Sequence, residues 1–305
     1  MDRHGVLVIG SMNFDTFYTL PHQMRLGENL HASNFQTACG GKGANQAVQC
    51  AKLQIPTLMV GCLGNDHQGD QIYAAMSGYG LDMHLVKRVQ TPTGNASVWA
   101  YPSGEVQAAI YGGANMCITR TEIDEIRPVL ERTAIVILQN EIPMETVEYA
   151  ILVSKAAGCI VIYNAAPALP VSPQALKAVD VLVVNEAEAS FYTGIHITGV
   201  SSAREGVQKL LPDLSGALII TLGHHGSLIA NNGGVHHVPA CKVQAVETTG
   251  AGDSYVGALA YGLLQGQAVT DAAALATAAA AITVSSIGAQ PAMPTLEILM
   301  AQKKT

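Results

Sequence analysis

Short apolar runs rich in β-branched residues recur along the chain, and longer segments of mixed polarity separate them. We interpret the runs at residues 6–9, 58–62, 135–138, 160–163, 181–184 and 218–221 as buried strands. Strands that alternate with helical segments form a parallel sheet covered by helices on both faces. The pattern therefore predicts an α/β fold with a doubly wound, mostly parallel sheet.

Two segments, about 16–39 and 93–111, depart from this rhythm. They contain short alternating pieces, and N-A-S-V-W-A-Y, P-S-G and E-V-Q-A-A-I-Y in the second segment indicate a hairpin around residues 102–104. We expect these segments to form a small β-sheet lid. Trp99 within it either covers a ligand or packs against the main sheet. No linker or low-complexity tract divides the chain, so we expect a single domain over residues 1–305.

Polar residues follow several of the predicted strands. They are Asn13 and Asp15, then Glu141, then Asn185 and Glu188, and finally Thr221, Gly223 and Gly226. The carboxyl ends of parallel strands share one edge of a sheet, where open α/β sheets bind ligands, so we expect a common cleft.

Each of these polar positions also has a plain structural explanation. Asn13 and Asp15 can bind a pair of sugar hydroxyls as donor and acceptor, or they can close the strand with an Asx turn. Glu188 can order the water shell of a magnesium ion, or it can be a solvated carboxylate at a helix start.

The segment G-G-K-G-A-N-Q-A, residues 40–47, precedes a helix and is similar to a phosphate-binding loop. It lacks the G-x-x-x-x-G-K-[ST] spacing, and no Ser or Thr follows Lys42. Lys42 and Asn45 therefore suit a polar, neutral ligand. The alternative is a tight glycine turn packed under the helix.

The segment E-T-T-G-A-G-D, residues 247–253, combines a glycine-rich turn with the start of an apolar helix. Free N–H groups and the helix dipole favour an anion there, and small residues let it approach the backbone. Asp253 follows Gly250, Ala251 and Gly252. This carboxylate can accept a proton from a hydroxyl beside the anion, or it can act only as a helix cap.

Composition narrows the function. The 305 residues are 49% hydrophobic and carry a net charge of -7, which argues against a nucleic-acid partner. No apolar run has the length of a signal peptide or membrane span, and the six cysteines form no C-x-x-C or zinc spacing. We therefore expect a cytoplasmic protein with free thiols and no membrane partner.

Six motifs together resemble the ribokinase family of carbohydrate kinases, the PfkB group. They are G-S-M-N-F-D, G-G-K-G-A-N-Q-A, N-E-A-E, T-L-G-x-x-G, T-G-A-G-D and G-A-Q-P, which occur in the family's order over nearly the whole chain. The resemblance is closest to the ribose kinases. It implies a doubly wound sheet with a β lid and transfer of the γ-phosphoryl of ATP, with Mg²⁺, to the 5-hydroxymethyl of D-ribose. A nucleoside or other sugar kinase, or a sugar-binding regulator without catalysis, are the alternatives.

The resemblance also implies a role for each motif residue. Asp253 is then the catalytic base, and the amides of Gly250, Ala251 and Gly252 form an anion hole. The sugar-binding positions are Asn13, Asp15, Gly41, Lys42, Asn45 and Glu141. The nucleotide-binding positions are Asn185, Thr221, Gly223 and Gly226, and Glu188 belongs to the motif linked to magnesium and phosphate.

A monovalent-cation site and a homodimer are further implications of the resemblance. The cation positions are Glu247, Thr249, Thr283, Ser286 and Gly288. Ribokinases usually carry Asp at position 247 and Ser at position 292, where this chain has Glu247 and Ala292, so K⁺ activation is an open hypothesis. The family dimerises through the lid. Within the lid this chain differs at Asn95, Ser97 and Trp99, which leaves room for another pentose or a nucleoside.

Overall fold

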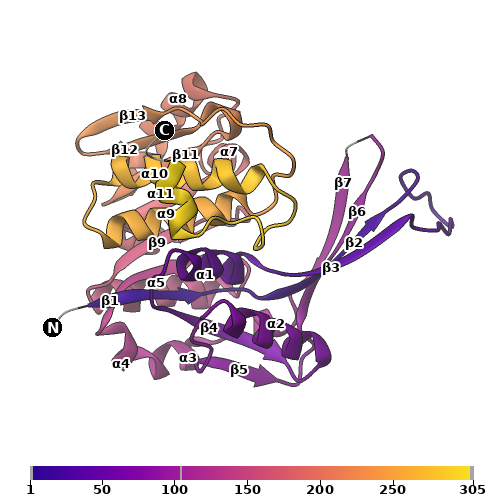
Figure 1. Ribbon diagram of the computed structural model, residues 1–305. Coiled ribbons are helices and arrows are strands. Elements are labelled where there is room, and N and C mark those ends of the chain that lie inside the picture. Colours follow the sequence, from indigo (N-terminus) through magenta and orange to yellow (C-terminus); the bar gives the residue numbers. More distant parts are fainter. Residues whose placement is uncertain (1–2, 104, 303–305) are drawn as a thin grey trace.

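The computed structural model describes residues 3–103 and 105–302. Its main element is a nine-stranded sheet in the order β13-β12-β11-β10-β9-β8-β1-β4-β5 (Figure 1). The strands are β1 (His4–Ile9), β4 (Thr57–Gly64), β5 (Val86–Val89), β8 (Thr133–Leu138), β9 (Ile160–Asn164), β10 (Val181–Val184), β11 (Ala217–Thr221), β12 (Ser227–Asn231) and β13 (Gly234–Val238).

Neighbouring strands from β5 to β11 are paired parallel, and the pairs β11–β12 and β12–β13 are antiparallel. The predicted mostly parallel sheet is therefore confirmed, with all six predicted strands in it. Strands β5, β12 and β13 were not among the predicted strands.

Helices cover both faces of this sheet. One face carries α1 (Lys42–Lys52), α2 (His67–Gly78), α9 (Ala251–Leu264), α10 (Val269–Val284) and α11 (Leu296–Gln302). The other carries α3 (Arg120–Glu125), α4 (Arg127–Leu130), α5 (Met144–Ala156), α6 (Pro173–Ala178), α7 (Glu186–Thr193) and α8 (Val200–Leu210). Short 3₁₀ turns are η1 (Gly113–Cys117), η2 (Leu211–Asp213) and η3 (Gly223–His225).

Strand β1 explains why both faces are buried. Leu7 and Ile9 belong to the core under α3–α8, whereas Val6 and Val8 belong to the core under α1 and α9. Successive side chains point to opposite faces, so a continuous apolar run buries both. None of the described helices combines the length and apolar character needed to span a membrane.

Small residues bring α9 close to α1. A Cβ atom added at Gly257 would lie 2.6 Å from the Cβ of Gln49 on α1. The absence of a side chain at Gly257 therefore lets the two helices approach. This approach carries the start of α9 to the start of α1, where the candidate site lies.

The second sheet has four strands in the order β3-β2-β6-β7. They are β2 (Asn13–Thr19), β3 (Asn34–Gly40), β6 (Gly94–Ala100) and β7 (Val106–Tyr111). Figure 1 shows this sheet projecting from the body as a lid. Strands β6 and β7 form the expected antiparallel hairpin, and Gly104 of its predicted turn lies outside the described residues.

The register of the lid determines which of its side chains face the site. Asp15 on β2 pairs with Ala96 on β6, and neighbouring paired residues share a face. Asn95, Ser97 and Trp99 therefore lie on the face opposite to Asp15. Trp99 therefore does not share a face with Asp15, and Ala96 and Val98 occupy the Asp15 face instead.

Candidate active site

Asp253 lies in the first turn of α9. Gly250 precedes this helix with a φ of 78°, and no side chain caps the helix start. Instead, the carboxylate of Asp253 accepts hydrogen bonds from Asn45 Nδ2 and Gln46 Nε2, each at 2.9 Å. The alternative that Asp253 is only a helix cap is therefore wrong, because its oxygens point toward α1.

Burial raises the pKa of the Asp253 carboxyl group, while the nearby Lys42 and the hydrogen bonds from Asn45 and Gln46 lower it. Burial leaves the Asp253 carboxylate with few water contacts, and the side chains of Asn45 and Gln46 provide two fixed N–H donors. Such a group can accept a proton from a hydroxyl placed beside it.

Two further side-chain amides, those of Gln139 and Gln290, hold the donor amides of Gln46 and Asn45 in place. Gln139 Nε2 donates to Gln46 Oε1 at 2.7 Å, and Gln290 Nε2 donates to Asn45 Oδ1 at 2.9 Å. Each amide thus uses its oxygen on an outer amide and its N–H on Asp253. Sequence reasoning assigned no role to Gln46, Gln139 or Gln290, although Gln46 and Gln290 lie inside the motifs G-G-K-G-A-N-Q-A and G-A-Q-P.

The predicted sugar-binding residues lie where the lid joins the body. Glu141 Oε2 accepts from Ser11 Oγ at 2.5 Å and from the backbone N–H of Lys42 at 3.1 Å. Gly41 has a φ of +89°, and a Cβ atom added there would lie 2.8 Å from the backbone N of Asn13. The glycine-rich motif that contains Gly41 therefore meets the strand-end motif that contains Asn13. The backbone conformation and the close approach at Gly41 both require glycine.

Asp15 extends from the lid toward this junction. Burial, followed by repulsion from Glu141, raises the pKa of Asp15 to about 6. Its Oδ1 atom is buried and has no hydrogen-bond partner. A buried acceptor without a partner is costly, so this atom is suited to a hydroxyl of a bound ligand.

Lys42 lies between the carboxylates. Burial lowers its pKa, but the charges of Asp253, Glu141 and Glu188 outweigh burial, and the pKa is raised overall. It lines a cavity of about 220 Å³ together with Asp253 and Glu188. A cation held at this point can stabilise negative charge on a phosphoryl group.

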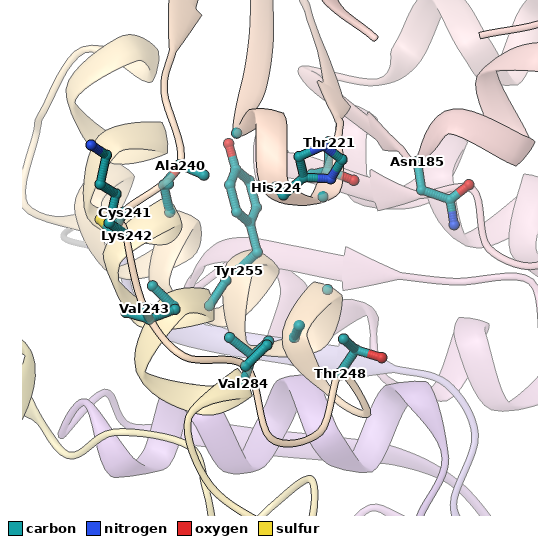
Figure 2. Close-up of a pocket in the computed structure, with 18 of the residues that line it drawn as sticks. Asn185, Thr221, His224, Ala240, Cys241, Lys242, Val243, Thr248, Tyr255 and Val284 are labelled. Carbon is teal, nitrogen blue, oxygen red and sulfur yellow. The ribbon is translucent and has the colours of Figure 1, made fainter. Parts of the chain in front are cut away.

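A larger cavity of about 890 Å³ adjoins the first (Figure 2). The four predicted nucleotide-binding residues line it, namely Asn185, Thr221, Gly223 and Gly226. Figure 2 shows Asn185 and Thr221 on one side and Val243 on the other. The two cavities share Asn185, Thr221, Thr248 and Gly252. A nucleotide in the larger cavity can therefore direct its phosphates toward Asp253.

Glu188 is part of the start of α7. Its carboxylate accepts from the backbone N and the side-chain Nδ2 of Asn185 at 2.9 and 3.1 Å, and its N–H donates to Asn185 Oδ1 at 2.9 Å. Burial raises its pKa, and the Asn185 backbone and Lys42 oppose this. Glu188 is thus a buried member of a capping box, not a solvated carboxylate, and it faces the cavity with Asp253.

The residues of the predicted cation site lie near the glycine-rich turn at residues 250–252. Glu247 Oε2 accepts from the backbone N of Gly288 at 2.8 Å, and the N–H of Ser286 donates to the carbonyl of Thr283 at 3.3 Å. The hydroxyl of Thr283 is buried and lies within hydrogen-bond distance of Ser254 Oγ, at 2.8 Å, and of the carbonyl of Ala279, at 3.0 Å. Thr249 is exposed. Glu247 and Gly288 are therefore in contact, while the Thr283 hydroxyl is used inside the helices.

The chain is similar to known carbohydrate kinases over nearly its whole length. The model of the pfkB family carbohydrate kinases matches residues 3–296. A ribokinase of Staphylococcus aureus is 32% identical over 96% of this chain and 97% of its own length, and a deoxyribokinase of Salmonella typhi is 34% identical over 96% of both. The structure of Arabidopsis thaliana ribokinase complexed with ribose and ATP has a TM-score of 0.92 at 31% identity, with 99% of each chain covered.

The fold and the site define a phosphotransferase that acts on an alcohol group. The chain belongs to the pfkB family of carbohydrate kinases.

Proposed function

We propose that this kinase transfers the γ-phosphoryl of ATP to the 5-hydroxymethyl group of a pentose, with D-ribose as the first candidate. One observation carries the proposal. The buried Asp253 lines the small cavity that adjoins the larger one, and Glu141, whose charge also acts on Asp15 of the lid, is close enough to act on the Asp253 carboxyl group. Similarity to the ribokinases, one of them solved with ribose and ATP, supports the choice of substrate.

The mechanism follows from the positions of these groups. Asp253 accepts the proton of the attacking hydroxyl as the new bond to phosphorus forms. The first N–H groups of α9 and the ammonium of Lys42 stabilise the charge on the transferred phosphoryl group. Phosphoryl transfer requires little covalent help, so positioning and charge stabilisation provide most of the rate.

Magnesium is expected with ATP, and it would neutralise charge on the phosphate oxygens. Among the described residues, no three His, Cys, Asp or Glu side chains group in a way that would hold a metal ion. Glu188 fits an indirect contact with the metal ion. It lines the cavity beside Asp253, and its carboxylate can accept hydrogen bonds from metal-bound water.

Asp253→Asn tests the proposal. The amide cannot accept the proton, so we expect a folded protein that has lost nearly all phosphorylation. The assay is coupled ADP release with D-ribose and ATP, with thermal unfolding as the control for folding. Turnover near that of the wild type would exclude Asp253 as the base.

A 2-deoxyribose kinase is the second candidate, because deoxyribokinases are as similar to this chain as ribokinases are. A panel of ribose, 2-deoxyribose, hexoses and nucleosides in the same assay distinguishes them. A sugar-binding regulator would bind ribose without releasing ADP.

The same panel in potassium and in a large organic cation tests the cation hypothesis. Two of the predicted cation residues, Glu247 and Gly288, are in contact beside the glycine-rich turn. Equal rates in both salts would reject the site.

We also propose a homodimer formed through the lid. Val106 and Ile110 on β7 are 60% and 66% exposed, and their pairing with Ala100 and Ala96 places them on the Asp15 face of the sheet. A second lid would cover these side chains. Light scattering of the wild type and of Ile110→Asp tests this, and a monomeric wild type would reject it.

A cytoplasmic location is consistent with the six free cysteines.

A further inference from the structure

Asn115 is a buried polar residue that no motif of the sequence analysis includes. It lies on η1, shortly after the lid strand β7, and is 2% exposed. Its Nδ2 donates to Asn13 Oδ1 at 2.7 Å, and its Oδ1 accepts from the backbone N–H of Met12 at 2.9 Å. It therefore bridges the backbone before β2 and the side chain of the first residue of β2.

The Met12 contact sets the direction of both amides. A backbone N–H can only donate, so Asn115 must present its oxygen to Met12 and its Nδ2 to Asn13. Asn13 must in turn present its oxygen to Asn115. The Nδ2 group of Asn13 is therefore the part of its amide that remains to donate hydrogen bonds to a ligand.

The backbone holds this pair tightly. Gly94 on β6 pairs with Asn13, and a Cβ atom added there would lie 2.3 Å from Asn115 Nδ2 and 2.6 Å from Asn13 Oδ1. On the other side, the N–H of Ala114 donates to the carbonyl of Pro92 at 2.7 Å. The amides thus have little freedom to turn without moving the chain.

We propose that Asn115 is a specificity-determining positioning residue that fixes Asn13 as a hydrogen-bond donor to the sugar. Asp15, two residues further along the same face of β2, is the matching acceptor, since its buried Oδ1 has no partner in the protein. A donor beside an acceptor fits neighbouring hydroxyl groups, one accepting from Asn13 and the other donating to Asp15. This inference rests on the proposed function.

The polarity also predicts which sugars are rejected. A protonated amino group facing Asn13 would set donor against donor, whereas a hydroxyl can accept. The site therefore favours sugars with free neighbouring hydroxyls over amino sugars at that position. A site built to hydrogen-bond a hydroxyl discriminates strongly against analogues without it.

Asn115→Asp tests the proposal by reversing this polarity. A carboxylate still accepts from the Met12 N–H but cannot donate to Asn13, so Asn13 must turn its N–H groups away from the ligand. We expect the KM for ribose to rise by about 10- to 100-fold, equivalent to about 1.4–2.8 kcal/mol. The KM for ATP should stay within about twofold, because the nucleotide cavity is unchanged.

A double-mutant cycle separates this role from general damage. If Asn115 acts through Asn13, then Asn115→Asp in an Asn13→Ala background should add no more than about a twofold loss of ribose affinity. Asn115→Ser provides a milder variant if Asn115→Asp unfolds, because its short hydroxyl cannot reach both partners. It should raise the KM for ribose by a smaller factor. Thermal unfolding and ADP binding verify folding in each variant.

The outcomes are distinguishable. A wild type that phosphorylates no sugar of the panel rejects the proposed function itself. An active wild type whose ribose KM changes by less than about twofold in folded Asn115→Asp and Asn115→Ser rejects the role of Asn115 alone. The role of Asn115 is also rejected if the losses of ribose affinity caused by Asn13→Ala and by Asn115→Asp multiply in the double variant.

Discussion

Replacing Gln46 with methionine should shift the pH dependence of catalysis. The side chains have similar length, but methionine removes the N–H that donates to Asp253 Oδ1 at 2.9 Å. A hydrogen bond to a charged group contributes about 1.5–3 kcal/mol, and 1.36 kcal/mol corresponds to about one pKa unit. The lost donor stabilised the ionised form, so the pKa of Asp253 should rise further and kcat/KM on the acidic limb should fall by about 10- to 100-fold.

The assay is kcat/KM for the sugar at saturating ATP as a function of pH. The active form of Asp253 is ionised, so a higher pKa moves the acidic limb toward neutral pH and lowers the rate below it. Gln139→Met removes only the outer amide that supports Gln46, and it should shift the limb less.

Gln49→Met is the matched control on the same helix. Gln49 is buried, donates to the carbonyl of Pro294 and accepts from Ser254 Oγ, without touching the carboxylate of Asp253. It should lower the melting temperature and leave the acidic limb in place. A folded Gln46→Met with the wild-type limb, or an equal shift in Gln49→Met, would refute the reasoning.

Further predictions concern the sugar side and the anion hole. Asp15 has a pKa raised to about 6, so the KM for the sugar should rise as pH falls through that value and the carboxylate loses its negative charge. Glu141→Gln removes the repelling charge and should move this rise to lower pH; an unmoved profile would show that Glu141 has no effect on Asp15. A Cβ atom added at Gly252 would have no atom within 4 Å, so the melting temperature of Gly252→Ala should equal that of the wild type. Its turnover should fall by about 100-fold or more if phosphate approaches this backbone. Gly250→Ala, with φ 78° and a Cβ atom 2.8 Å from that of Ala289, should lose both stability and activity, and an unaffected melting temperature would contradict this.

The fold could be predicted for most strands that are buried on both faces, although the buried β12 (Ser227–Asn231) was missed. Continuous apolar runs such as 135–138 identify central strands because every side chain contacts a core. Strand β5 (Val86–Val89) is short and has two charges, and the residues of β13 (Gly234–Val238) are mostly exposed. Such edge strands depend on pairing with a neighbour, which their own composition does not reveal.

The candidate site could be predicted only as far as its motifs extend. Asp253, Asn45 and Lys42 stand in recognisable segments, and the structure brings them together. Gln46 and Asp253 are 207 positions apart, and Gln139 lies 93 positions from Gln46. The roles of such amides depend on which atom of a distant residue each one faces, and Asn115 is the same case. No local pattern carries that information.

The placement of the site across two bodies has a consequence for measured affinity. Asn13 and Asp15 belong to the lid, whereas Asp253 and Lys42 belong to α9 and α1 of the body. A sugar that contacts both is a non-covalent cross-link between them, so it binds fully only to conformers in which the bodies are correctly apposed. Its apparent dissociation constant is then the intrinsic constant divided by the fraction of such conformers. A substitution in the lid far from any ligand atom can therefore weaken sugar binding simply by changing that fraction.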